Sequence, residues 1–195
     1  MRIVIVAIFG MLCSFCSNRT NLSEKEEFIL DSMKEYTLIG ENGEESSLLD
    51  VVMEFESVLI SNQYLRSVSK KDYELFYDQF IIGDSLADVR LVYETNNLFI
   101  ALGYASTQAR SWYIFDTATK NMKLNNVESS TIFNIHRILE GNFDQFSISE
   151  NLFHKYLNSL SNEEFESKSI YRVPLLIIFY LELEKRYYDS TLNQE

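Results

Sequence analysis

Cysteine is absent from residues 17–195, since the chain's two cysteines are Cys13 and Cys16. A secreted domain stabilised by disulfides carries cysteines through its body, so the folded part of this chain does not depend on disulfide bonds. Proline occurs once and glycine six times in 195 residues. This scarcity favours long regular elements with few tight turns.

Basic residues are also scarce. The chain has 17 Lys and Arg against 29 Asp and Glu, a formal net charge of −12 at pH 7. Phosphate binding relies on clusters of Lys and Arg, so this balance disfavours nucleic acid as a partner. It is compatible with a basic protein or a cation as ligand, and equally with surface charge that only keeps the domain soluble.

Motifs for common catalytic and cofactor sites are lacking. The sequence has no P-loop, dinucleotide fingerprint, G-x-S-x-G elbow, HExxH pairing or calcium loop. We interpret His136 as a packed, hydrogen-bonded side chain on a helix with Ile132 and Leu139, and we expect His154, next to Phe153, to border the apolar face of its helix. We expect no cofactor and no metal. Asp84 and Asp88 are a candidate carboxylate pair for a hydrolase, although Asp84 also fits the cap of a short helix after Gly83.

The N-terminus has the composition of a secretion leader. Arg2 precedes a 13-residue apolar run from Ile3 to Phe15, within the range of about 7–15 residues that is typical of signal peptides. The run is shorter than the ~20 residues of a transmembrane helix. We therefore predict a signal peptide over residues 1–15, which places the mature protein outside the cytosol.

The segment Leu12-Cys13-Ser14-Phe15-Cys16 resembles the lipoprotein box of bacterial lipoproteins. It departs from that pattern at Phe15, where Gly, Ala or Ser is expected. The resemblance implies that Cys16, or less favourably Cys13, carries a lipid, and that residues 16–22 tether the domain to the outer membrane or the periplasmic face of the envelope. Two alternatives stay open: ordinary cleavage that releases a secreted domain, and an uncleaved N-terminal anchor.

Residues 23–195 are predicted to form one helix-rich domain. A Ser followed three residues later by an acid is typical of a helix N-terminus, and five such pairs occur: Ser23/Glu26, Ser47/Asp50, Ser69/Asp72, Ser147/Glu150 and Ser161/Glu164. Apolar residues follow at helical spacing, and we expect these to face the core: Phe28, Met33, Tyr36, Leu48, Val52, Phe55, Leu59, Tyr73, Phe76, Phe80, Ile148, Leu152, Tyr156 and Leu160. Helices are therefore expected over about 23–83 and 128–190, with Gly83 and Gly141 suited to helix ends.

Strands are predicted in the middle of the chain. The apolar runs 89–93 and 98–104 flank the polar turn Thr95-Asn96-Asn97, and Ser111–Phe115 is rich in good strand formers. We expect a small antiparallel β-meander over residues 89–124. The predicted fold class is accordingly α+β, as a single domain.

The segment Val173–Leu181 is a nine-residue apolar run containing Pro174. It is too short to span a bilayer. Pro174 fits the first turn of a helix. We predict a central helix that is buried on nearly all sides, with a buried strand as the alternative.

These observations predict an envelope-anchored bacterial lipoprotein whose domain acts as a non-enzymatic binding or interaction module, with a protein as a candidate partner. One alternative is an acidic inhibitor or immunity-type protein that neutralises a basic toxin or hydrolase. The other is an envelope hydrolase that uses carboxylates. Aromatic residues such as Trp112, Tyr171 and Tyr180 are candidates for a binding surface or for core packing.

Overall fold

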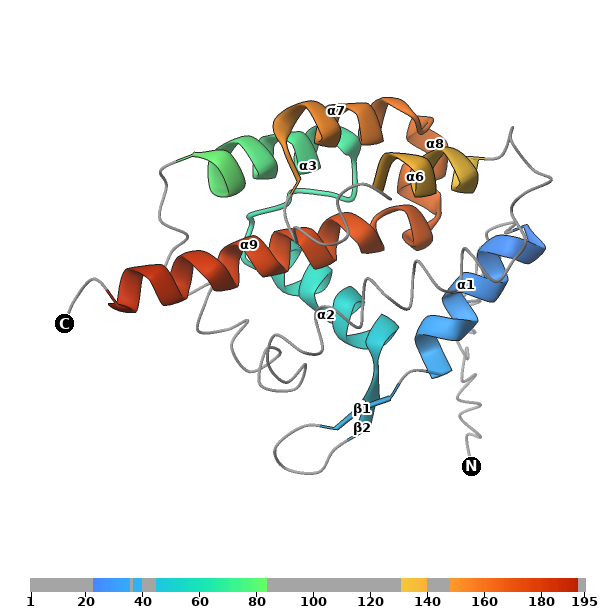
Figure 1. The fold of residues 1–195 in the computed structure, drawn as a ribbon, viewed down its shortest axis with the longest axis horizontal. Helices are drawn as coiled ribbons and strands as arrows, with labels where there is room; N and C mark the ends of the chain where they lie inside the picture. Colours follow the sequence, from blue (N-terminus) through green and yellow to red (C-terminus); the bar gives the residue numbers. More distant parts are fainter. Residues whose placement is uncertain (1–22, 36, 40–44, 84–130, 140–147, 193–195) are drawn as a thin grey trace, which may run out of the picture.

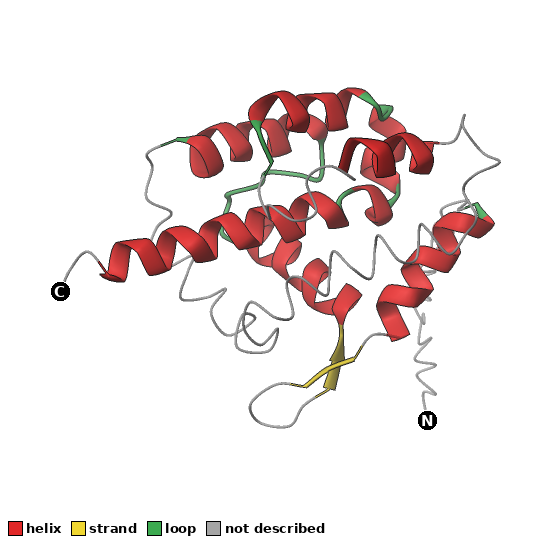
Figure 2. Cartoon of the chain, in the orientation of Figure 1, coloured by secondary structure: helices red, strands yellow, loops and turns green. Residues whose placement is uncertain are grey.

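The computed structural model describes residues 23–35, 37–39, 45–83, 131–139 and 148–192, and helices dominate this part of the chain (Figures 1 and 2). The elements, in chain order, are α1 (Glu24–Glu35), β1 (Thr37–Ile39), β2 (Glu45–Ser47), α2 (Leu48–Ser61), α3 (Lys70–Phe76), the π-helix η1 (Tyr77–Ile82), α6 (Thr131–Leu139), α7 (Glu150–Asn158), α8 (Asn162–Ser167), the 3₁₀ turn η4 (Ser169–Tyr171) and α9 (Val173–Leu192). The predicted predominance of helix is confirmed.

Helix α9 lies at the centre of the fold, with α2 on one side and α3 and α7 on the other (Figure 1). Every residue from Val173 to Tyr180 is buried. Pro174 is the second residue of the helix, where its missing N–H costs no helical hydrogen bond. The predicted central helix is confirmed, and the alternative of a buried strand is wrong.

Serine caps begin most of the described helices where the sequence predicts them. Ser47 and Ser69 accept hydrogen bonds from the backbone N–H groups of Asp50 and Asp72, at 3.0 and 3.2 Å. Ser161 forms a complete capping box with Glu164. These bonds satisfy N–H groups that the first helical turn leaves without partners.

One predicted capping pair is wrong. The cap of α7 is Ser149, which accepts from the N–H of Leu152 at 3.4 Å, and Glu150 is the first helical residue. Ser147, which the Ser-x-x-Glu spacing selects, lies outside the described residues. Two serines two positions apart offer competing caps, and the local pattern does not distinguish them.

The buried face of α1 also differs from the prediction. Ile29, Leu30 and Met33 are buried, whereas Phe28 is 47% exposed. The same face carries Glu26, which is only 3% exposed. A charged residue at a core position breaks the apolar stripe, so the sequence pattern wrongly favours Phe28.

A two-stranded hairpin interrupts the region predicted as all helix. β1 pairs with β2 in antiparallel register, with Thr37 opposite Ser47 and Ile39 opposite Glu45. Ser47 is both the last residue of β2 and the N-cap of α2. The sequence signal was the Asn42-Gly43 dipeptide, which is typical of hairpin turns, but β2 lacks the apolar alternation that identifies a strand.

The helix predicted to begin at Ser69 continues beyond α3 as the π-helix η1 and ends at Gly83, as expected. The i→i+5 bonding of a π-helix widens the turn. Ile81 is therefore buried, while Phe80, which regular helical spacing places in the core, is half-buried. The predicted core residues of α2, namely Leu48, Val52, Phe55 and Leu59, are all confirmed as buried.

Several predicted features lie outside the described residues: the signal peptide, the tether, Tyr36, the meander over 89–124 and Gly141. Among the helices that the structure describes, none combines the length and apolar character needed to cross a membrane.

Candidate functional site

A buried ion pair joins α2 to the start of α9. The Arg172 Nε donates to the Glu56 Oε1 at 2.7 Å, and Nη2 donates to Oε2 at 3.3 Å. The Tyr73 hydroxyl donates to the same carboxylate. The Arg172 Nη1 donates to the backbone carbonyls of Phe165 and Glu166 at 2.8 and 3.0 Å. Arg172, the residue before α9, therefore links α2 to α8. Tyr73 connects α3 to the same cluster through the Glu56 carboxylate.

A second buried carboxylate holds α1 against the turn before α9. The Lys168 Nζ donates to both oxygens of Glu26 at 3.0 and 3.1 Å, and the Tyr171 hydroxyl donates to Oε1. The Ser23 N–H donates to Oε2 at 2.6 Å. Burial alone raises the pKa of Glu26, but the hydrogen bonds from Tyr171, Ser23 and Lys168 outweigh it and hold the pKa below its ordinary value.

Four buried tyrosines have raised pKa values, and two of them, Tyr73 and Tyr171, donate to Glu56 and Glu26. Desolvation raises the pKa of Tyr73, Tyr156 and Tyr171 above the ordinary range, and raises the pKa of Tyr77 to about 12. They stay protonated and act as donors, as Tyr156 does to the backbone carbonyl of Tyr171 at 2.8 Å. Because each buried charge is hydrogen bonded within the protein, we interpret both clusters as structural.

A pocket among the described residues lies at helices α6 and α7. Two anchors place the helices. Phe153 of α7 stacks on Tyr77 with a centroid distance of 4.0 Å. Thr131, the first residue of α6, donates to Glu164 of α8 at 2.9 Å. The apolar side of α7 therefore faces the core, and its other side faces outward.

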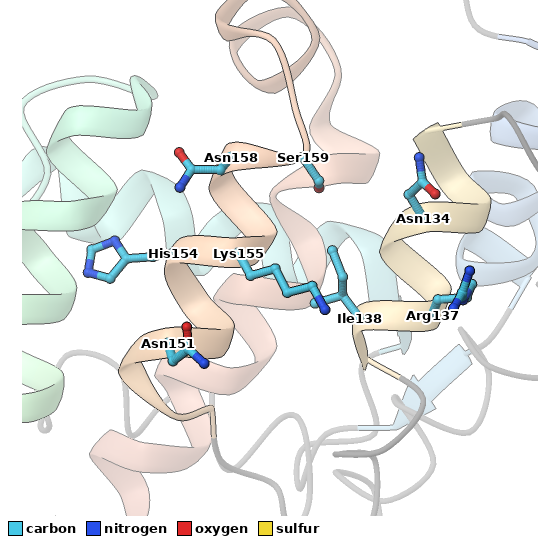
Figure 3. A pocket seen from close by; sticks show the side chains of 8 residues that line it. All are labelled: Asn134, Arg137, Ile138, Asn151, His154, Lys155, Asn158 and Ser159. Atoms are coloured by element: carbon cyan, nitrogen blue, oxygen red, sulfur yellow. The ribbon is translucent and has the colours of Figure 1, made fainter.

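The pocket has a volume of about 670 Å³, which is within the range of small-molecule sites. Its walls are helical faces with i, i+3 and i+4 spacing, and the lining residues are Asn134, Arg137, Ile138, Asn151, His154, Lys155, Asn158 and Ser159. In Figure 3 the side chains of Lys155 and Ile138 lie between α6 and α7, whereas His154 extends from α7 away from α6. We refer to it as the α6–α7 pocket.

Among the described residues that line the α6–α7 pocket, seven have polar side chains and none is an acid. The lining combines three amides, one hydroxyl, two cationic side chains and a histidine over a single aliphatic residue, Ile138, which is buried. Lys155 and Arg137 contribute positive charge to this surface, and the carboxylate of Glu150 lies beside it, with its Oε1 4.0 Å from the His154 Nε2. Asn amides donate and accept hydrogen bonds, and Lys and Arg attract anionic oxygens.

Sequence reasoning found little of this pocket. His154, expected to border the apolar face of its helix, is half-buried, and its Nε2 lies 4.0 Å from the Glu150 Oε1. Asn151, Lys155 and Asn158 were missed. Their i, i+4 and i+7 spacing is the available signal, but it describes any solvent-facing helix stripe.

The other candidate residues have mixed outcomes. Cys16, Asp84 and Asp88 lie outside the described residues, as does the side chain of His136. Tyr171 and Tyr180 are buried core residues. Within the described ranges, no three His, Cys, Asp or Glu side chains gather closely enough to hold a metal ion.

Comparison with protein-family models, with curated proteins and with solved structures gives no match for this chain.

Proposed function

We propose that this chain is an envelope-anchored bacterial lipoprotein whose domain is a non-enzymatic binding module. The sequence supports the anchor through the apolar run after Arg2 and through Cys16. The α6–α7 pocket supports the binding role, and it is the observation that carries this proposal. Three of its described lining residues are asparagines, whose amides hydrogen bond to a ligand without gaining or losing protons near neutral pH.

The anchor is tested by mass spectrometry of the N-terminal fragment from cells of a bacterium that makes lipoproteins. We expect the fragment to begin at Cys16 and to carry acyl chains. The matched variants are Cys16→Ser, which removes the lipid, and Cys13→Ser, which leaves it in place. A fragment that begins at Met1 without acyl chains contradicts the anchor. A lipid that survives Cys16→Ser contradicts its assignment to Cys16 and favours Cys13.

The binding role is tested on the full chain by a capture experiment with envelope extracts and by a screen for turnover of envelope substrates. We expect a specific, saturable ligand that is recovered chemically unchanged. Robust turnover of a substrate, with no ligand retained, contradicts a non-enzymatic module and favours the hydrolase alternative.

An acidic inhibitor of a basic toxin or hydrolase is the second candidate. Exposed acids at positions 27, 31 and 35 line one side of α1, next to the exposed Phe28. Their i, i+4 spacing places them on one helical face. Binding of a basic protein by such a face weakens steeply as salt concentration rises, and salt-independent binding contradicts this candidate.

The proposal also retains an antiparallel meander over residues 89–124, which makes the domain α+β. Its support is the strand-forming composition of 89–93, 98–104 and 111–115. Circular dichroism tests it, since a helical spectrum without a β contribution beyond the short β1–β2 hairpin contradicts the meander.

A further inference from the structure

The α6–α7 pocket carries an inference about the chemical class of its ligand, which rests on the proposed binding function. Asn134, Arg137 and Ile138 share one face of α6, and Asn151, Lys155 and Asn158 share one face of α7. The two helices pack against each other, and in Figure 3 Lys155 and Ile138 lie between them, while Arg137 and Asn158 extend to the outer sides of the pair. Polar groups on rigid helices hold their positions better than groups on loops.

Charge narrows the choice of ligand. Lys155 is exposed and, among the residues that the structure describes, has no carboxylate within ion-pair distance. Lys34 and Lys168 are each paired with an acid, whereas the exposed Lys71, like Lys155, has no carboxylate within ion-pair distance among the described residues. Lys155 therefore places a positive charge at the pocket, and none of the described lining residues is an acid.

The asparagine amides of the pocket narrow the choice of ligand further. Asn134, Asn151 and Asn158 are all exposed at the pocket, and each presents two N–H donors and one carbonyl acceptor. Groups of this kind recognise hydroxyls and amides on a ligand, while a flexible lysine contributes a point charge toward a carboxylate or phosphate. Ile138 provides a small apolar surface beside them.

We infer that the α6–α7 pocket binds a small anionic molecule that carries a carboxylate or phosphate group on a hydroxylated skeleton, as in a sugar acid or a sugar phosphate. The anionic group lies at Lys155, with Arg137 at the edge of the site. The asparagine amides hydrogen bond to the hydroxyl groups. A sugar acid and a sugar phosphate both carry the anionic oxygens that a lysine attracts.

Isothermal titration calorimetry on the full chain tests this inference with glucuronate, glucose 6-phosphate, inorganic phosphate and neutral glucose as probes. We expect saturable binding of glucuronate or glucose 6-phosphate. The one that binds more tightly shows whether the site prefers a carboxylate or a phosphate. Glucose should bind at least about tenfold more weakly, because loss of one charge-assisted hydrogen bond corresponds to roughly that factor.

Two variants with matched controls locate the site. Lys155→Gln should weaken binding about tenfold, and Lys71→Gln, which removes a charge from an exposed lysine of α3 outside the pocket, should not. Asn158→Asp places a negative charge in the lining and should abolish binding of the anionic probes. Asn162→Asp makes the same change at the exposed start of α8 and should leave binding intact.

Three results overturn the inference: saturable binding by none of the anionic probes, equal binding of glucose, or equal weakening by the pocket and control variants. Each of these leaves the lipid on Cys16 and capture of another ligand untouched, so the proposed function can stand. Conversely, chemical conversion of a bound probe contradicts the non-enzymatic role while the ligand class holds.

Discussion

The Glu56–Arg172 pair is the interaction whose removal should destabilise this fold most clearly. Arg172 is 6% exposed and Glu56 is 4% exposed. In Arg172→Met the carboxylate of Glu56 stays buried with Tyr73 as its remaining donor among the described contacts. The backbone carbonyls of Phe165 and Glu166 lose their donor in the same substitution.

The expected cost follows from this geometry. Breaking a buried pair by removing one partner typically costs about 3–5 kcal/mol, because an uncompensated charge remains in a poorly solvated place. A domain of this size has a free energy of unfolding of roughly 5–15 kcal/mol. Arg172→Met should therefore remove a large fraction of the total stability.

Urea unfolding followed by circular dichroism measures this cost, provided that the m-value is unchanged. The double variant Glu56→Leu with Arg172→Met removes both charges, so it should cost less than the sum of the single variants by about 2 kcal/mol or more. The control is Lys34→Gln at the exposed Lys34–Asp31 pair, at 3.1 Å. It should cost less than about 0.5 kcal/mol.

Two outcomes refute the reasoning. If Arg172→Met costs no more than Lys34→Gln, the pair does not contribute as a buried ion pair. If the single costs add in the double variant, Glu56 and Arg172 are not energetically coupled, and their contact is incidental to stability.

Three further predictions concern stability and are tested by thermal unfolding. Because Glu26 has a lowered pKa in the folded state, its contribution should be complete above its ordinary pKa of 4.5 and decline as pH falls through the folded value. Glu26→Gln should be destabilised at pH 7 and lose less stability on acidification than the parent, and parallel pH profiles contradict this. The Cβ that Gly83→Ala adds lies 2.5 and 2.8 Å from the carbonyl oxygens of Gln79 and Asp78, so this variant should lower the free energy of unfolding by about 1–3 kcal/mol. An unchanged melting temperature argues against that packing. Ser161→Ala should cost about 1 kcal/mol through loss of the capping box, whereas Ser57→Ala, in mid-helix, should be close to neutral; equal effects contradict the capping role.

The candidate pocket shows where sequence reasoning fails. Asn151, Lys155 and Asn158 follow the pattern of an ordinary solvent-facing helix, and nothing in that pattern says that α6 packs beside them. For Glu26 and Glu56 the sequence misleads in the opposite direction, because it gives no sign that these acids are buried. Each is an acid at a position that the fold buries, and its partner lies more than a hundred residues away, at Lys168 or Arg172.

Local sequence signals were enough to predict the helix starts at Ser47, Ser69 and Ser161, the helix end at Gly83 and the central helix from Val173, because caps and apolar periodicity act within a few residues. Which charges are buried, which serine caps α7 and which polar side chains gather at the α6–α7 pocket depend on the folded chain. These features arise from packing between segments distant in the chain, and their energies are set by burial and by the partners that the fold brings within reach.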